Sequence, residues 1–447
     1  MVITIKNIGI IKKTSVECNN ITLITGKNGS GKSTFGKAVG SVFCGLINAQ
    51  NEYDEYFYKY MRNQILEIMG IPTRPLSLLE FGHDYFSLPT LRRIVYGKIT
   101  FVYNKENIFK LFNQLFDEIS SYENKTNVAN IQSVDNREID RLFSEQNDNY
   151  VNESTSSILN KLRYKIDELY DLYDNQTFYQ NYVSLAIRDK LNNAFSGQVK
   201  NIELKRKSSL IQIDNNTINL KFEFGDDGDV LSYSRNAQTK FVFYIEDADF
   251  IDNLFARDNK KESGSRAFQY YLKKELQKPL DKVLKLQMIE KYKEIFDAIN
   301  SVYPYDFLTE EKSTITTNNG IDIKNEACGR KIFALIKEMM YRGLINNDSI
   351  IIFDEPDNHL HPEWQVKFID LIVKINKLTG AKIICITHSP TILFATQVFT
   401  KDVADLKVYF CDTINKNDIF TDVSSNIEKA HKELADPYIK LDIFGSI

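Results

Sequence analysis

The sequence predicts an α/β protein, a mixed sheet with flanking helices that carries an inserted β-lobe and a short helical arm. Three observations predict it. A glycine-rich segment, residues 26–34, stands between an apolar β run and a helical pattern. A second apolar run ends at Asp354 and Glu355, about 320 residues later. Strand and helix patterns then alternate, which is typical of a parallel sheet. The two ends of the chain therefore complete one domain.

The composition of the 447 residues fits a globular protein of two or three domains, with 43% hydrophobic residues. A net charge of −4 is not the footprint of a dedicated nucleic-acid binder, although it leaves a local basic patch open. The five cysteines show no C-x-x-C spacing, which favours a reduced, cytoplasmic compartment. No signal peptide is evident and no apolar run approaches 18 residues, so we expect no membrane partner.

The first predicted segment, residues 1–50, is the N-terminal half of the α/β domain. Short strands are predicted at 2–5, 14–17 and 21–25, and a helix over 34–47 follows the glycine-rich segment. Strand, glycine loop and helix in this order are the context that a phosphate-binding loop requires.

The second predicted segment, residues 51–194, is a helical insertion. Two helical stripes, 108–119 and 159–173, are separated by a polar stretch over 121–157. A short antiparallel arm and a plain helical subdomain both fit this pattern. Residues 195–260 are predicted as a β-lobe, and residues 261–324 as a helical segment. The strands expected in the β-lobe are 210–213, 218–224 and 241–245.

The last predicted segment, residues 325–447, is the C-terminal half of the α/β domain. It begins with a helix over 329–341, which Gly343 ends as a C-terminal cap. The elements expected after it are a strand at 349–353, a helix at 362–378, and strands at 382–387 and 406–410.

The glycine-rich segment matches the phosphate-loop pattern G-x-x-x-x-G-K-[ST] in full. Backbone N–H groups of such a loop cradle phosphates, a lysine adds charge, and a serine hydroxyl binds Mg²⁺. The sequence therefore predicts ATP and Mg²⁺ as ligands, with Lys32 on the phosphates and Ser33 on the metal. A chance match is disfavoured by the flanking strand and helix. The candidate loop residues are Gly26, Lys27, Asn28, Gly29, Ser30, Gly31, Lys32, Ser33 and Thr34.

The second half of the candidate site follows the apolar run at 349–353. Asp354 is expected to hold Mg²⁺, directly or through water, and Glu355 to be the base that activates the attacking water. A carboxylate pair after a strand could also cap a helix, but the phosphate loop makes the catalytic interpretation stronger. His388 follows the strand at 382–387, where it could donate a hydrogen bond to a γ-phosphate. Zinc binding is the rival interpretation of His359, His361 and His388. It is disfavoured because His359 and His361 are only two residues apart and have no cysteine partner.

Three segments carry a resemblance to a known family: G-K-N-G-S-G-K-S-T, D-E-P-D-N-H-L-H-P-E-W-Q and I-T-H-S-P. They resemble the ABC-type ATPases grouped with the overcoming-lysogenization-defect (OLD), RecF and Rad50 proteins. Within this group they are most similar to the ATP-binding proteins of anti-phage systems, such as the Septu ATPases and their retron-associated relatives. The ending at 428–442 is also similar to the tails of that group. The resemblance covers about 1–50 and 325–447 and implies an ABC-type ATPase head.

The resemblance implies a role for each matching residue. The magnesium carboxylate falls on Asp354, the catalytic glutamate on Glu355 and the switch histidine on His388. The loop that faces a dimer partner falls on 358–361. The signature segment of the family, which contacts the γ-phosphate held by the partner, falls on 325–331 and keeps Gly329 at the start of a helix. Its serine is replaced by Cys328, a weak donor, so hydrolysis is expected to be slow. The Q-loop glutamine is not assigned.

The function that the resemblance implies is an ATPase that forms a nucleotide-sandwich homodimer, or a higher even oligomer, in phage defence. Only 59 residues follow His388, too few for the nuclease domain of OLD-type proteins, so a separately encoded effector, expected to be a nuclease, is implied as a partner. The alternative is a DNA-repair or chromosome-maintenance ATPase that clamps DNA, for which the best basic runs are 205–207 and 92–93. A transporter ATPase is disfavoured because it would be more compact.

Overall fold

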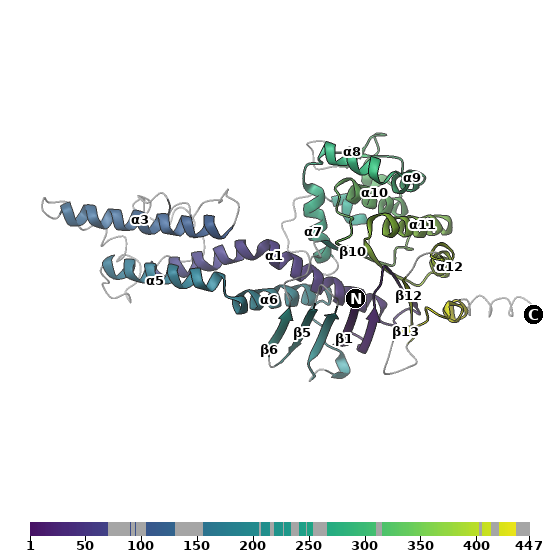
Figure 1. The fold of residues 1–447 in the computed structure, drawn as a ribbon, viewed down its shortest axis with the longest axis horizontal. Helices are drawn as coiled ribbons and strands as arrows, with labels where there is room; N and C mark the ends of the chain where they lie inside the picture. The colour runs from purple at the N-terminus through teal and green to yellow at the C-terminus, as the bar shows by residue number, and fades with distance from the viewer. Residues whose placement is uncertain are drawn as a thin grey trace, which may run out of the picture. The chain divides into compact units, whose positions relative to one another are not determined.

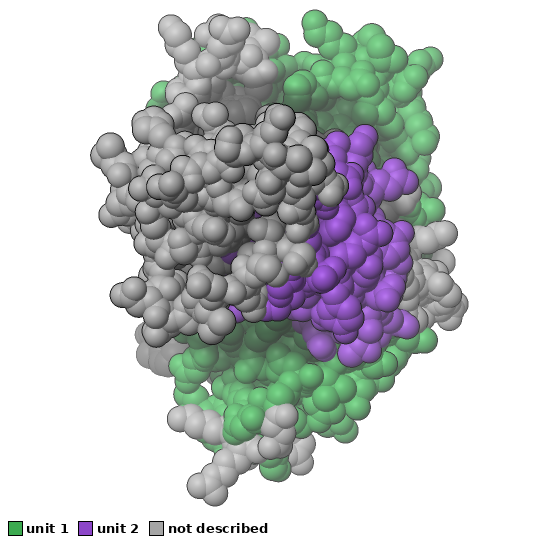
Figure 2. Space-filling model, turned by 90° about the vertical axis from the view of Figure 1, so that its left-hand side faces the viewer, with its two compact units in different colours: residues 1–48, 183–447 green, residues 49–182 purple. Residues whose placement is uncertain are grey.

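The chain forms two compact units, residues 1–48 with 183–447 and residues 49–182 (Figure 2). The computed structural model is shown as a ribbon in Figure 1. It describes residues 1–69, 90, 94, 104–129, 155–204, 207–214, 219–226, 228–233, 241–246, 248–253, 266–309, 315–401, 405–412 and 420–434.

A six-stranded mixed sheet forms the centre of the first unit. Its strands are β3 (Ile21–Gly26), β7 (Phe241–Ile245), β10 (Ser349–Asp354), β11 (Lys382–Thr387), β12 (Leu406–Cys411) and β13 (Phe420–Asp422). Their order across the sheet is β13-β12-β3-β11-β10-β7, and only the β12–β13 pair is antiparallel. The predicted α/β fold with a mixed sheet is therefore confirmed. The parallel strands are nearly continuous apolar runs because helices bury both faces of such a sheet.

The first unit also contains a five-stranded antiparallel sheet (Figure 1). Its strands are β1 (Val2–Ile8), β2 (Ile11–Glu17), β4 (Ser209–Asp214), β5 (Asn219–Gly225) and β6 (Gly228–Tyr233). The order is β2-β1-β4-β5-β6. The alternating buried and exposed side chains of β1 and β5 match a sheet with one covered face.

The β-lobe expected over 195–260 does not stand alone. Its strands β4, β5 and β6 pair with the N-terminal β1, whereas β7 joins the parallel sheet beside β10. The sequence explains the division, because β4 and β5 alternate apolar and polar side chains while β7 reads Phe-Val-Phe-Tyr-Ile. A wholly apolar strand needs burial on both faces, which only the parallel sheet provides.

Helices α7 to α12, from the later part of the chain, cover the mixed sheet. Their bounds are α7 (Arg266–Gln277), α8 (Lys282–Lys291), α9 (Lys293–Asn300), α10 (Cys328–Tyr341), α11 (Pro362–Thr379) and α12 (Pro390–Phe399). A short hairpin, β8 (Phe307–Thr309) with β9 (Ile315–Thr317), and the 3₁₀ turn η4 (Ile323–Asn325) lie between α9 and α10. Two further 3₁₀ turns, η2 (Ile202–Leu204) and η3 (Asp249–Asn253), precede β4 and α7. Helix α10 is buried almost throughout, and side chains of α9, α10, α11 and the sheet share one core.

The ends of these helices follow local chemistry. Pro362 and Pro390 occupy first helical positions, where a missing N–H costs nothing, and His361 and Ser389 cap the same helices. Gly380 ends α11 at φ +76°, and Gly343 follows α10 at φ +63°, as predicted for a C-terminal cap.

The second unit, residues 49–182, is helical. Helix α1 (Lys32–Ile68) runs on past the predicted end at 47, and α3 (Lys105–Ala129), α5 (Thr155–Tyr173) and the first part of α6 (Gln176–Ala194) complete it. Its core is aromatic and aliphatic and draws on α1, α3 and α5, with Phe57, Phe112 and Leu169 fully buried. A core shared by three helices fits the helical-subdomain interpretation better than a two-helix arm.

The boundaries of the two units differ from the predicted segments, which divided the chain at 50/51 and 194/195. Both divisions of the structure fall inside long helices, α1 and α6, where the sequence shows no break. The basic run 92–93, residues 205–206 of the other run, most of the polar stretch 121–157 and residues 435–442 lie outside the described residues. No described helix is both long enough and apolar enough to cross a bilayer.

Candidate functional site

The phosphate loop occupies the turn between β3 and α1. Gly26 is the last residue of β3, and Lys32, Ser33 and Thr34 form the first turn of the helix. Gly26 has φ +145°, and a Cβ built on it would lie 2.2 Å from the carbonyl oxygen of Cys411 on β12. Only glycine fits this approach. The predicted phosphate loop therefore leaves the sheet through a position that only glycine can occupy.

Lys32 lies inside this loop. Its side-chain amine donates to the carbonyl oxygens of Gly26, at 2.9 Å, and Lys27, at 2.8 Å. Burial lowers the pKa of Lys32, while nearby acidic groups, including Glu355 and Asp354, act in the opposite direction. The loop thus curls around the amine, which is held beside the backbone N–H groups that would face phosphate.

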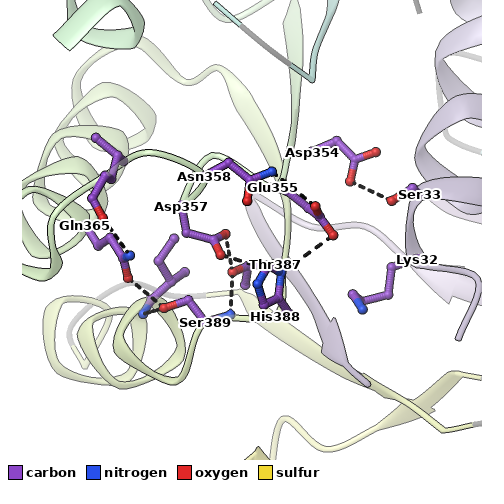
Figure 3. Close-up of polar contacts among 12 residues, drawn as sticks. Lys32, Ser33, Asp354, Glu355, Asp357, Asn358, Gln365, Thr387, His388 and Ser389 are labelled. Carbon is purple, nitrogen blue, oxygen red and sulfur yellow. Dashed lines mark hydrogen bonds and ion pairs between the residues drawn. The ribbon is translucent and has the colours of Figure 1, made fainter. Parts of the chain in front are cut away.

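Ser33 and Asp354 join the two halves of the candidate site (Figure 3). The hydroxyl of Ser33 donates to Oδ1 of Asp354 at 3.2 Å, although 321 residues separate them. Asp354 is 1% exposed at the carboxyl end of β10. Burial raises the pKa of Asp354 to about 6, against the hydrogen bonds from Tyr244 and Ser33, which lower it. The site therefore holds a buried carboxylate that a cation would stabilise.

Glu355 follows with an unusual backbone. Its φ is +53°, a left-handed conformation that is uncommon for residues other than glycine, and its amide still donates to the carbonyl oxygen of Ile386 at 2.8 Å. The side chain is 32% exposed, and its Oε2 accepts a hydrogen bond from the Asn358 side-chain amide at 3.2 Å. Its carboxylate lies between the side chains of Asp354 and His388 (Figure 3).

His388 lies opposite Glu355, at the end of the neighbouring strand β11. Its Nδ1 is 3.6 Å from Oε1 of Glu355 and 3.6 Å from Oδ2 of Asp357 (Figure 3). Asp357 in turn accepts a hydrogen bond from the Thr387 hydroxyl at 2.6 Å, and burial raises its pKa. The imidazole is 40% exposed, so one side faces acidic groups and the other remains accessible.

A hydrogen-bond network fixes the segment after the carboxylates. Ser389 donates to the side-chain oxygen of Gln365 at 2.6 Å, and Gln365 donates to the carbonyl oxygen of Leu360 at 3.1 Å. His361 accepts from the amide of Glu363 and caps α11. His361 therefore has a structural role as a helix cap, which explains its position without a bound zinc ion.

Gly329 is the second residue of α10, and the structure places it against this same segment. A Cβ at Gly329 would lie 2.5 Å from the carbonyl oxygen of His359, so the close approach requires glycine. Cys328 is exposed at the helix start, and Ala327, the N-cap residue, offers no side-chain hydrogen bond to the first turn. Gly329 thus packs on the loop after the carboxylates, and the first turn of α10 receives no hydrogen bond from its N-cap side chain.

Two residues that lie at the site, Tyr244 and Glu246, were not predicted from the sequence. The Tyr244 hydroxyl donates to Oδ2 of Asp354 at 2.5 Å. Glu246 follows the end of β7 and forms an ion pair with Lys37 at 3.1 Å. Ile245 pairs with Phe353 in the sheet register, which brings both residues beside Asp354. The one signal in the sequence was an apolar strand at 241–245, and nothing local shows which strand it adjoins.

The groups assembled here suit a nucleotide with its metal. Hydroxyl and carboxylate oxygens, which Ser33 and Asp354 supply, are the ligand class that Mg²⁺ prefers. The buried hydroxyl of Ser30 has no hydrogen-bond partner among the described residues, and a Cβ at Gly29 would meet nothing within 4 Å. The loop therefore keeps both an unsatisfied polar atom and the space that phosphate oxygens need.

The chain is similar to one curated protein and to several solved structures. A segment of 99 residues is 38% identical to the Septu protein PtuA of Bacillus thuringiensis, a match over 19% of this chain and 24% of that protein. The chain thus spans about a quarter of the length of this curated relative. Among solved structures, the SMC head domain from Thermotoga maritima has a TM-score of 0.34 at 12% identity, over 94% of this chain and 97% of that one. An SMC head bound to the C-terminal winged-helix domain of ScpA has a TM-score of 0.37 at 11% identity, over 96% and 98%. Scores this low support no inference about function.

The family comparison covers most of the chain. The model for the AAA ATPase domain matches residues 1–393, which include the phosphate loop, Asp354, Glu355 and His388. The resemblance seen in the sequence is therefore confirmed at the level of the family. The chain belongs to the AAA ATPase domain family.

Proposed function

We propose that the chain binds and hydrolyses ATP with Mg²⁺ as the regulatory subunit of a bacterial anti-phage defence system. In this proposal two copies enclose ATP and control a separately encoded effector, expected to be a nuclease. The strongest support for the proposal is the hydrogen bond from Ser33 to Asp354, because it joins two half-sites from opposite ends of the chain. Neither half-site alone would support more than phosphate binding.

Each residue has a role in this chemistry. The loop N–H groups and Lys32 would hold the phosphates, while Ser33 and Asp354 would hold the metal. Bound Mg²⁺ would neutralise charge on the phosphate oxygens. Glu355 would accept a proton from the attacking water, since its carboxylate is partly exposed beside His388. His388, which faces Glu355 at 3.6 Å, would donate a hydrogen bond to the γ-phosphate.

The start of α10 supports the proposed dimer. Its first turn has no side-chain cap and would offer backbone N–H groups to an anion, and Gly329 lies against the loop at His359. In a nucleotide sandwich this terminus would meet the γ-phosphate bound by the other copy. Cys328 stands where a serine would add a stronger hydrogen bond, so we expect slow turnover.

The role in defence rests on relatives. The resemblance of the motifs to the Septu group and the 38% identity to a Septu protein over 99 residues support it. That match is short, so partner and trigger are part of the proposal.

Nucleotide binding tests the proposal first. Lys32→Ala should abolish ATP binding, because the loop loses its buried cation, whereas Lys12→Ala removes a lysine from a surface ion pair with Glu203 and should bind as the wild type. Equilibrium binding of a fluorescent ATP analogue measures both. Wild-type affinity in Lys32→Ala would refute the assigned loop.

The oligomeric state tests the sandwich. The Glu355→Gln variant should bind ATP without turning it over, so ATP with Mg²⁺ should convert it to a dimer in sedimentation velocity. A protein that stays monomeric under these conditions contradicts the sandwich. The purified chain alone should leave DNA and RNA intact, and degradation by it would place the nuclease in this chain.

A further inference from the structure

Both oxygens of the Asp354 carboxylate are occupied by hydroxyl groups from different elements. Ser33 on α1 donates to Oδ1 at 3.2 Å, and Tyr244 on β7 donates to Oδ2 at 2.5 Å. Ser33 lies in the first turn of α1 and is half-buried. Tyr244 belongs to a strand of the sheet and is 1% exposed. The phenol is therefore the more deeply buried of the two hydrogen-bond donors.

The ring of Tyr244 is itself held between the sheet and helix α1. A Cβ built on Gly36 would lie 3.1 Å from Cε2 of the ring, and one on Gly40 would lie 3.2 Å from its Cβ and Cδ2. Two glycines one helical turn apart thus let α1 pack directly on the ring. Glycine is unfavourable inside a helix, by about 1 kcal/mol relative to alanine, so this contact must offset a local cost.

The same contact reaches the carboxylate. A Cβ at Gly36 would also meet Ile386 at 2.6 Å and lie 3.8 Å from Oδ2 of Asp354. The first turns of α1, the Tyr244 ring and Asp354 are therefore in one packed group behind the phosphate loop. A movement of Tyr244 would change the direction of the Asp354 carboxylate. It would also change the packing of α1, the helix that carries Lys32 and Ser33.

The phenol also favours the ionised form of the carboxylate. A buried carboxylate costs free energy unless its oxygens accept hydrogen bonds. The hydrogen bond from Tyr244 lowers the pKa of Asp354, while burial and the nearby carboxylates of Glu246 and Glu355 raise it. Without the phenol, Oδ2 would be left buried and unpaired, and the carboxylate would be free to rotate.

We propose that Tyr244 is a positioning residue for the metal site: it fixes the Asp354 carboxylate with Oδ1 beside the Ser33 hydroxyl, and these two groups would hold the cation. This inference rests on the proposed function, since it concerns the same Mg²⁺–ATP site. Tyr244 touches neither metal nor nucleotide in this account and acts through Asp354.

Tyr244→Phe tests the role of the hydroxyl, because it keeps the ring in its slot and removes one oxygen. Tyr303→Phe is the matched control: Tyr303 is 0% exposed in the same unit, and its hydroxyl has no hydrogen-bond partner among the described residues. Binding of a fluorescent ATP analogue to the full chain is measured in EDTA and against increasing Mg²⁺. Thermal unfolding in EDTA checks that each variant folds.

The expected result separates an effect on Mg²⁺ binding from an effect on nucleotide binding. Tyr244→Phe should raise the Mg²⁺ concentration for half-maximal enhancement of ATP binding about tenfold, as for a lost hydrogen bond to a charged group. Binding in EDTA should stay within about twofold of the wild type, and Tyr303→Phe should change neither quantity. A shift below twofold, an equal shift in Tyr303→Phe, or an equal loss of binding in EDTA would overturn the positioning role. A wild-type protein whose ATP binding ignores Mg²⁺ would contradict the proposed function itself.

Discussion

The imidazole Nδ1 of His388 lies 3.6 Å from Oε1 of Glu355, across the carboxyl ends of two neighbouring parallel strands. The two side chains reach this position by different means. Glu355 turns through a left-handed backbone conformation, and His388 directly follows β11. Strained backbone at such a position is typical of functional sites. In the proposed mechanism, the attacking water and the γ-phosphate would meet next to this pair.

His388→Ala should lower the rate of ATP hydrolysis about 10²-fold, because one hydrogen-bond donor to the developing charge is removed. ATP affinity should change little, since the loop and Lys32 hold the nucleotide. His361→Asn is the control, an exposed histidine replaced by another good helix cap. Steady-state phosphate release measures both variants. Equal rates in His388→Ala and the wild type would remove His388 from the catalytic group.

Asp354→Asn should stabilise the protein when nucleotide and metal are absent. The pKa of Asp354 in the folded protein is about 6, above its ordinary value of 3.8, so the folded state binds more protons between these values. The free energy of unfolding therefore falls as pH rises from about 4 to about 6. The total loss of stability from ionising this buried carboxylate, about 3 kcal/mol, persists above pH 6. Asparagine carries no charge and avoids this cost.

Thermal unfolding in EDTA tests this stability prediction. The midpoint of Asp354→Asn should exceed that of the wild type at pH 7.5, and the difference should shrink as pH falls toward 4. Asp281→Asn, at an exposed helix cap that asparagine also fills, should show no such dependence. A lower midpoint for Asp354→Asn at pH 7.5 would contradict the cost assigned to the buried carboxylate.

Cys328→Ser should accelerate hydrolysis several-fold. A serine hydroxyl is a stronger donor than a thiol, and about 1 kcal/mol of added transition-state stabilisation corresponds to roughly fivefold in rate. Cys328→Ala, which offers no donor, should not accelerate it. The rates should be compared at protein concentrations that favour the dimer. If serine and alanine act alike, the side chain at 328 does not contact the phosphate.

Much of the site's framework could be predicted from sequence because its pattern is local. The strand at 382–387 was predicted with its observed bounds, and the turn from β3 through the loop into α1 follows from adjacent residues. The helix over 34–47 was too short by about 20 residues, since α1 continues along a face with Tyr53 and Phe57 that packs only in the folded unit.

The parts that could not be predicted depend on strand neighbours. Nothing within residues 241–245 shows that β7 adjoins β10, so Tyr244 and Glu246 could not be linked to Asp354. The same holds for β4, whose partner β1 lies about 200 residues earlier. Helix α12 was also missed, although Ser389 and Pro390 are a cap and a first helical residue. The contact of Gly329 with His359 likewise arises only from tertiary packing.

The most direct test of the central claim, that the two ends of the chain form one hydrolytic site, is ATP hydrolysis by Glu355→Gln measured alongside ATP binding. Glutamine keeps the size of the side chain and cannot accept the proton. We predict ATP binding close to that of the wild type and turnover lower by about 10²-fold or more, roughly 3 kcal/mol of transition-state stabilisation. Hydrolysis by Glu355→Gln at the wild-type rate would contradict the account.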